Sequence, residues 1–216
     1  MNLVCPLPAA LVEIPQPDCP FKFDQIVRMA FQRRQPEATP PFPTLADAQT
    51  LAKWTAFKSA VDAKKLVVSP IFAGLVFPQS EALTTGGNDN STFNGIRNYN
   101  GEGAVTVTGV FTNIPPATKR ALDNLTMFSL AGATGISNLT AYFVNRDLVV
   151  YGENPFAAGV PSTVYRGIPI YNFRVSSPGS EGFNAPNLNA YSFDLPASWA
   201  DYIAAWKPNF DPLTEL

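Results

Sequence analysis

The sequence predicts an α+β to mainly β fold, in which a single domain has an antiparallel sheet, β-sandwich or barrel-like core with two or three short helices. Two observations support this prediction. Segments rich in β-branched and aromatic residues recur along the chain, and they do not alternate regularly with helices as a doubly wound parallel sheet requires. The chain has 216 residues, of which 46% are hydrophobic, a size and composition typical of one domain.

An extended arm is expected at residues 1–23, before the domain at residues 24–216. The first twenty residues contain five prolines, and proline lacks the backbone donor that a sheet ladder needs and restricts the residue before it. We expect this apolar arm to contact a neighbouring subunit, and packing against its own domain is the alternative. The arm residues predicted to lie in the interface are Pro6, Pro8, Pro15 and Pro17.

The two cysteines of the chain, Cys5 and Cys19, also lie in the arm. No signal peptide is recognisable in the sequence, so two free and buried thiols are the default expectation. A disulfide between them would close a short loop, and the sequence does not decide between the two states. Two cysteines are too few for a four-ligand structural zinc site without carboxylates or a second subunit.

Helices are predicted near residues 45–65, 116–128 and 198–206. The first begins with a capping-box pattern, because Thr44 is followed three positions later by the acid Asp47. The second opens at Pro116, where the missing N–H costs nothing, and the third follows a serine cap at Ser198. The apolar residues expected to face the core are Leu51, Trp54, Phe57 and Val61 in the first helix, Ala121, Leu125 and Phe128 in the second, and Trp199, Ile203 and Trp206 in the third.

Strands are predicted at residues 25–33, 66–77, 104–113, 139–151, 165–176 and 191–195. Residues 104–113 alternate between apolar and polar side chains, which places Val105, Val107 and Phe111 on one buried face. Residues 139–151 are predicted to be a hairpin that turns at residues 145–147. The strand at residues 66–77 is expected to be broken at Pro70 and Gly74.

Composition excludes several classes of function. The chain has no histidine, so it has neither a Ser-His-Asp or Cys-His relay nor an HExxH zinc site. Fifteen basic and seventeen acidic residues give a net charge of −2, which excludes the broad basic surface of a nucleic-acid-binding protein. No segment approaches the roughly 18 uninterrupted apolar residues of a membrane-spanning helix, and we therefore expect no membrane partner.

The polar segment at residues 86–95, GGNDNSTFNG, is predicted to be a long structural or interfacial loop. The spacing of its oxygen-bearing side chains, Asn90, Thr92 and Asn94, partly matches a calcium-binding loop. The twelfth position, however, is Gly101 instead of the glutamate that binds calcium with both oxygens. Asp89 is the one charged residue of the segment, so we expect no metal and no other cofactor. The loop residues expected to contact a neighbour are Asn88, Asp89 and Asn90.

A pair of carboxylates is the catalytic arrangement that remains available to a chain without histidine. The candidate pairs are Asp194 with Asp201 and Glu181 with Asp194, which would suit a glycosidase if they lay close together. The sequence supplies no distance between them. We therefore expect no enzymatic activity, and no residue is assigned a catalytic role.

Five segments together resemble virion structural proteins of tailed phages and prophages that infect Bacteroidetes, including the crAss-like phages. These segments are residues 86–95 (GGNDNSTFNG), 167–176 (GIPIYNFRVS), 181–189 (EGFNAPNLN), 194–199 (DLPASW) and 209–216 (NFDPLTEL). The resemblance covers most of the chain from about Leu45 onward. It carries over no functional residue.

This resemblance implies a non-enzymatic component of the phage particle, made in the bacterial cytoplasm and located in the virion. It implies a ring of identical copies in the neck or tail, as a connector or tail-tube component. Such a homo-oligomeric ring of about six or twelve copies would contact portal, neck or tail proteins. DNA would pass through its lumen without sequence-specific binding.

Two other functions compete with this expectation. The first is a capsid decoration, fibre-attachment or glycan-binding module that presents Tyr, Trp and Asn side chains to a host glycan. The second is an enzyme that uses two carboxylates. A ring in solution would favour the assembly protein, whereas glycan binding by a monomer or trimer would favour the module, and turnover lost on one Asp or Glu substitution would favour the enzyme.

Overall fold

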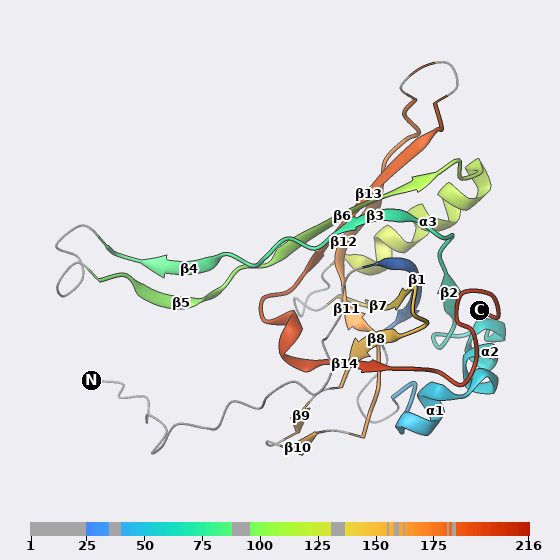
Figure 1. The fold of residues 1–216 in the computed structure, drawn as a ribbon, viewed down its shortest axis with the longest axis horizontal. Helices are drawn as coiled ribbons and strands as arrows, with labels where there is room; N and C mark the ends of the chain where they lie inside the picture. Colours follow the sequence, from blue (N-terminus) through green and yellow to red (C-terminus); the bar gives the residue numbers. More distant parts are fainter. Residues whose placement is uncertain are drawn as a thin grey trace.

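In the residues that it describes, the computed structural model of the chain (Figure 1) has two main antiparallel sheets that pack face to face, with three α-helices around them. It describes residues 25–34, 40–87, 96–130, 137–154, 156–157, 160–161, 163–180, 182 and 185–216. The chain is a single strand-rich domain, which confirms the predicted α+β to mainly β class. None of the helices in these ranges is long and apolar enough to cross a membrane.

The larger sheet has six strands with β7 at its centre. The strand order is β14-β8-β7-β1-β2, and the short β11 also pairs with β7. β1 covers one edge of β7 along its whole length, and β8 and β11 share the other edge. The bounds are β1 Ile26–Arg33, β2 Leu66–Val68, β7 Leu139–Asn145, β8 Val150–Glu153, β11 Ile168–Pro169 and β14 Ile203–Trp206.

The smaller sheet has four strands in the order β12-β13-β6-β3. Its bounds are β3 Ala73–Val76, β6 Val105–Thr112, β12 Tyr171–Val175 and β13 Leu188–Leu195. The predicted alternation in β6 is confirmed, because Val105, Val107 and Phe111 are buried while the threonines between them are exposed. β13 begins three positions before the predicted strand, since it pairs with β6 from Leu188 to Leu195.

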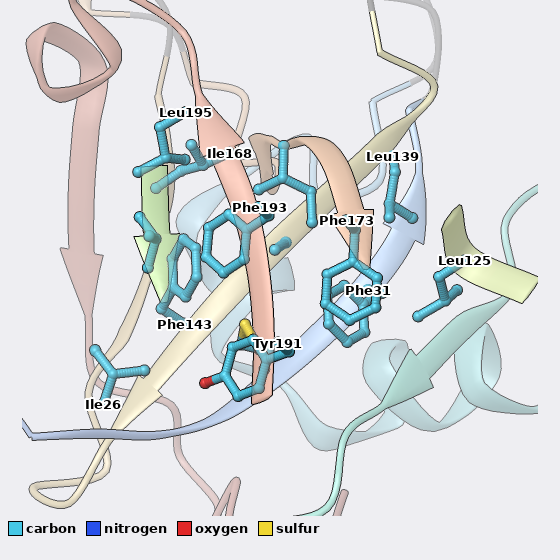
Figure 2. Close-up of a cluster of buried hydrophobic side chains, with 14 of the residues drawn as sticks. Ile26, Phe31, Leu125, Leu139, Phe143, Ile168, Phe173, Tyr191, Phe193 and Leu195 are labelled. Carbon is cyan, nitrogen blue, oxygen red and sulfur yellow. The ribbon is translucent and has the colours of Figure 1, made fainter. Parts of the chain in front are cut away.

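The main hydrophobic core lies between the two sheets (Figure 2). The ring of Phe31 in β1 meets that of Phe173 in β12 edge to face, with centroids 5.2 Å apart. Phe143 in β7 stacks with Phe193 in β13 at 5.9 Å. These contacts join the sheets, and the fold is therefore a β-sandwich at its centre.

A second core lies on the opposite face of the six-stranded sheet, under α1 (Leu45–Gln49) and α2 (Leu51–Ser59). Trp54 is fully buried there, and its ring lies 4.8 Å from Phe42 and 5.0 Å from Tyr142. The indole N–H groups of Trp54 and Trp206 donate to the same carbonyl of Ala48, at 2.8 and 3.2 Å. This shared acceptor ties the helices to β14.

The first predicted helix is two helices separated at Thr50, and it ends at Ser59 instead of residue 65. Thr50 is extended, with φ −98° and ψ 120°, and its hydroxyl donates to the carbonyl of Ala46 at 2.7 Å. That bond satisfies one of the last carbonyls of α1 and stops the helix. Val61 lies beyond the helix end and is 98% exposed, so its predicted place in the core is wrong.

The predicted capping box at the start of α1 is confirmed. The Thr44 hydroxyl accepts from the backbone N–H of Asp47 at 3.1 Å and donates to its carboxylate at 2.8 Å. The hydroxyl bond holds the pKa of Asp47 below its ordinary value, because it stabilises the charged carboxylate.

The second predicted helix is α3 (Pro116–Ser129), which matches the predicted range. Its buried face is formed by Leu122, Leu125 and Ser129 instead of the predicted Ala121, Leu125 and Phe128. The hydroxyl of Ser129 accepts from the backbone N–H of Phe173 at 2.8 Å, which fixes that face against β12. Phe128 is consequently left at the margin and is 45% exposed.

The third predicted helix, near residues 198–206, is wrong. Residues Trp199–Tyr202 form one turn of 3₁₀ helix, and Ile203–Trp206 form the edge strand β14. β14 pairs with β8 from Ile203 opposite Glu153 to Trp206 opposite Val150. The hydrogen bonds that these four residues form with β8 favour a strand over the helix that the spacing of the apolar side chains predicted. Two of those side chains still pack as expected, because Trp206 is buried and Trp199 stacks on Phe77.

The remaining strands form two separate hairpins. β4 (Ala82–Thr85) pairs with β5 (Asn98–Glu102), and β9 (Phe156–Ala157) pairs with β10 (Val160–Pro161). The predicted hairpin at residues 139–151 is confirmed as β7 and β8. The predicted strand at residues 66–77 is two strands, β2 and β3, which lie in different sheets on either side of Pro70. The predicted break at Gly74 is wrong, because β3 runs through it and only the register with β6 shifts there.

Tyr191 in β13 has a buried hydroxyl that has no hydrogen-bond partner among the described residues. Its ring lies across Gly109 in the opposite strand, where a Cβ atom would come within 2.4 Å of the ring. The ring also lies 4.5 Å from Phe111 and 5.3 Å from Phe72. The hydroxyl lies over Gly109, and burial raises its pKa far above the ordinary value.

We predict that Tyr191→Phe increases the free energy of unfolding by about 1 kcal/mol, because it removes an unpaired buried hydroxyl and keeps the ring. Tyr142→Phe is the matched control, since the Tyr142 hydroxyl lies 3.2 Å from Oε1 of Gln32 and its loss leaves that oxygen unpaired. Urea denaturation should show opposite signs for the two variants. A decrease of similar size in both would contradict the prediction.

We also predict that Trp54→Ala lowers the free energy of unfolding by about 3–5 kcal/mol, the usual cost of truncating a buried tryptophan. Val61→Ala, a change in the same predicted apolar stripe, should alter it by less than about 0.5 kcal/mol because its side chain is exposed. Chemical denaturation followed by far-UV circular dichroism measures both values. Equal effects would mean that the stripe is buried as one unit.

Candidate interaction surfaces

The hairpin of β4 and β5, here called the projecting hairpin, extends away from both sheets (Figure 1). It continues the ribbon that begins as β3 and β6, which pair within the four-stranded sheet. Beyond that sheet the two chains remain paired, since the N–H of Gly103 donates to the carbonyl of Glu81 at 2.9 Å. The direction of the hairpin is thus set by strands that belong to the core.

Burial changes abruptly along this ribbon. β6 alternates between buried and exposed residues, whereas every residue of β4 is exposed and so is all of β5 except Gly101. Leu83 and Tyr99 are large apolar side chains on the hairpin, and they are 52% and 63% exposed. A two-stranded hairpin with no packed face is at best marginally stable in water. The projecting hairpin therefore has no buried face among the residues that the structure describes.

Local hydrogen bonds give the hairpin its register. Asn100 donates to the Thr85 hydroxyl at 3.0 Å, and the hydroxyl of Ser80 donates to the Glu102 carboxylate at 2.9 Å. The register shifts between Leu83 and Thr84, which follows from an extra residue on the opposite strand. These bonds organise the hairpin without covering its apolar side chains.

A second apolar surface is a groove between α3 and the strands β1 and β2, here called the α3 groove. Its volume is about 300 Å³. It is lined by Phe31, Gln32, Arg33, Asp62, Ala63, Lys65, Val67, Leu125, Phe128 and Leu139. Near it on α3, Met127 is 74% exposed and Leu130 is 45% exposed. Large apolar side chains thus gather around the end of α3 in the part of the chain that the structure describes.

A second hollow, more polar than the α3 groove, lies along the four-stranded sheet and has a volume of about 470 Å³. Its polar lining includes Thr108, Arg174 and Ser192. The guanidinium of Arg174 donates to the Ser192 hydroxyl at 2.8 Å. Two of its principal polar groups are therefore already bonded to each other.

The carboxylates proposed from the sequence occupy different settings. Asp194 accepts hydrogen bonds from Thr106 and Asn172, both at 2.7 Å, and so joins side chains of three neighbouring strands. Asp201 lies in the 3₁₀ turn, and Glu181 is outside the described residues. Within the described ranges, no group of three or more Cys, Asp or Glu residues is placed to hold a metal ion.

Shifted pKa values also fall at positions that hold the fold together. Burial lowers the pKa of the Arg28 guanidinium, which donates to carbonyls of the C-terminal segment at Pro212 and Leu213. The backbone N–H of Leu213 lowers the pKa of Asp211 by stabilising its carboxylate. Each of these shifts has a structural cause, and they give no indication of an acid or base poised for catalysis.

All seven interface residues predicted from the sequence lie outside the described residues. These are Pro6, Pro8, Pro15, Pro17, Asn88, Asp89 and Asn90, and Cys5 and Cys19 are outside them as well. The sequence reasoning missed the α3 groove and the exposed side chains of the projecting hairpin. The sequence signal that would have indicated the hairpin is the pair of apolar residues Leu83 and Tyr99, one on each side of the glycine-rich loop.

We predict that amide hydrogens of β4 and β5 exchange at least about tenfold faster than those of β6 and β13 in dilute protein, because every residue of β4 and all of β5 except Gly101 are exposed. At concentrations where the protein self-associates, exchange in the hairpin should slow while exchange in β13 stays constant. Hydrogen exchange read by mass spectrometry measures both. Uniformly slow exchange in dilute protein would show that the hairpin needs no partner.

No known family model, curated protein or solved structure matches the chain. The functional argument therefore depends on the geometry and chemistry of its own residues. Of the surfaces described above, the projecting hairpin is the one whose strands have almost no buried residue.

Proposed function

We propose that this protein is a non-enzymatic structural subunit that self-assembles into a ring through its projecting hairpin. The observation that carries the proposal is the change in burial along the ribbon from β6 to β5, where the paired strands leave the core and expose Leu83 and Tyr99. A hairpin of this kind gains stability when another molecule covers it. In a homo-oligomer, each subunit supplies that cover for a neighbour.

We further propose that this ring belongs to the neck or tail of a bacteriophage particle, as a connector or tail-tube component. The support is the resemblance of five sequence segments to virion proteins of Bacteroidetes phages. The partners would be further copies of the chain and portal, neck or tail proteins. A net charge of −2 suits a lumen through which DNA passes, since affinity for phosphates grows with cationic contacts.

A capsid decoration or glycan-binding module is the second candidate. The hollow on the four-stranded sheet favours it, because Thr108, Arg174 and Ser192 present hydroxyl and guanidinium groups beside an open surface. Binding of a glycan by the monomer would support this candidate. A glycan would have to break or share the hydrogen bond between Arg174 and Ser192. The glycan-binding module is therefore the weaker of the two candidate functions.

The deciding experiment shortens the hairpin. Residues 82–102 are replaced by Asn-Gly, a two-residue turn that connects Glu81 to its hydrogen-bonded neighbour Gly103. We expect the wild type to form a ring of about six or twelve copies and the shortened variant to be monomeric. At concentrations below those at which the wild type assembles, both should have the same melting temperature, because the described hairpin residues belong to neither core.

Mass photometry and light scattering across a concentration series provide the readout. Leu45→Ser, which alters an exposed side chain in α1 outside both the hairpin and the α3 groove, is the control and should assemble normally. A wild type that stays monomeric at every concentration would refute the proposal. A shortened variant that still forms the ring would assign assembly to another surface.

A further inference from the structure

We propose that Asn100, in β5 of the projecting hairpin, is a site of spontaneous covalent modification, where the side-chain amide is lost and aspartate or isoaspartate remains. Three features of the hairpin support this assignment: the glycine that follows Asn100, the place of Asn100 in the strand ladder, and the bonding of its amide. The modification does not depend on the proposed self-assembly, because the reaction takes place within one hairpin.

The reaction needs the two residues Asn100 and Gly101 and water. The backbone nitrogen of Gly101 gives its proton to the solvent and attacks Cγ of Asn100, so a carbon–nitrogen bond forms and a succinimide ring closes. The bond between Cγ and Nδ2 breaks, and Nδ2 takes a proton from the solvent and leaves as ammonia. Water then opens the ring at either carbonyl and leaves aspartate or isoaspartate. This chemistry involves no oxidation or reduction, and asparagine is among the thermolabile residues of proteins.

The glycine after Asn100 leaves the attacking nitrogen uncrowded. Gly101 has no Cβ atom to hinder the approach of its nitrogen to the Asn100 side chain. Its φ is +118°, a conformation that residues with a Cβ atom rarely adopt. A Cβ atom placed at Gly101 would meet no described atom within 4 Å beyond its chain neighbours. The local backbone therefore offers little steric resistance to ring closure.

Asn100 lies at the irregularity of the hairpin ladder. Gly101 is opposite Leu83, and Tyr99 is opposite Thr84, so Asn100 is the extra residue between the two pairs. An extra residue of this kind disrupts the ladder locally. Ring closure requires rotation of the backbone between residues 100 and 101, which a regular ladder would oppose. The irregularity thus lies where the reaction needs backbone freedom.

The amide of Asn100 is restrained by a hydrogen bond across the hairpin. Its Nδ2 donates to the hydroxyl of Thr85 at 3.0 Å, and both residues are exposed. Because water competes for both groups, such a bond contributes little net free energy. It therefore slows the approach of Cγ to the Gly101 nitrogen without preventing it.

The modification would change both the charge and the backbone of the hairpin. A carboxylate in place of the amide adds one negative charge to a chain of net charge −2, in the same strand as Glu102. Isoaspartate also adds a carbon atom to the backbone between residues 100 and 101, which would displace the pairing of Gly101 with Leu83. Aged protein would thus differ from fresh protein at the hairpin.

Peptide mapping of the full chain tests the proposal. The protein is kept dilute in mildly alkaline buffer at physiological temperature, and samples are digested with trypsin at successive times. Cleavage after Arg97 and Lys119 releases residues 98–119 as one peptide and leaves the other Asn-Gly pair, at residues 94–95, in a different peptide. Mass spectrometry with electron-transfer fragmentation locates each lost amide and distinguishes aspartate from isoaspartate.

Asn98 is the internal control, because it is exposed in the same strand, has Thr85 opposite it in the ladder and is followed by Tyr99. We expect Asn100 to lose its amide at least about tenfold faster than Asn98, since a Cβ atom on the following residue hinders the attack. Both aspartate and isoaspartate should appear at Asn100. Asn100→Gln should abolish the loss at this position, because the longer side chain cannot close the same ring.

Two substitutions of Thr85 test the restraint on the amide. Thr85→Val removes the acceptor and should speed the loss at Asn100 about two- to fivefold, which corresponds to one exposed hydrogen bond. Thr85→Ser is the matched control, since it keeps a hydroxyl and should leave the rate within a factor of about two. Equal rates in the wild type and both variants would overturn the role given to this bond.

The site itself would be overturned if Asn100 and Asn98 lost their amides at equal rates, or if aspartate appeared at Asn100 without isoaspartate. The second result would indicate direct hydrolysis and exclude the succinimide. The proposed ring is tested separately, by mass photometry of freshly prepared protein, so failure of one proposal is distinguishable from failure of the other.

Discussion

The structure depends on β7, a central strand that is buried on both faces along all seven of its residues. Phe143 stacks with Phe193 in the core between the sheets, while its neighbour Tyr142 packs against Trp54 in the second core. Because successive side chains of a strand point to opposite faces, this one strand supplies the centre of both cores. A slip of one residue would exchange the two sets, so the pairing of β7 with β1, β8 and β11 sets the register of the whole sheet.

Buried polar side chains next to β7 serve the architecture. The amide of Gln32 donates to the carbonyl of Lys64 at 2.7 Å and accepts from the Tyr142 hydroxyl at 3.2 Å, so it connects β1, β7 and the segment before β2. Arg166 and Glu153 form a largely buried ion pair at 2.9 Å beside the edge of β8. In each case the partner is another structural group, which is how a buried polar side chain avoids the cost of desolvation.

The two aromatic cores and the projecting hairpin are separate parts of the described fold. The free energy of folding comes from two aromatic cores, and the projecting hairpin contributes to neither. Its base is nevertheless rigid, because β6 and β13 pair along their full length. The hairpin therefore leaves the four-stranded sheet in a direction that this ladder sets, and the end of α3 exposes Met127, Phe128 and Leu130 elsewhere on the molecule.

The sequence by itself determined the elements whose signals act within a few residues: the capping box at Thr44, the proline that opens α3, and the alternation in β6. Segments with distant partners were decided by the tertiary structure alone. Residues 203–206 have helical spacing and yet form a strand, because β8 offers them an edge about fifty residues away in sequence. Phe128 belongs to the predicted apolar stripe and is left exposed, because Ser129 holds α3 against β12. Capping and turn hydrogen bonds are local, whereas burial is a relation between residues far apart in the chain, and the pattern of apolar residues does not say which of them the fold will cover.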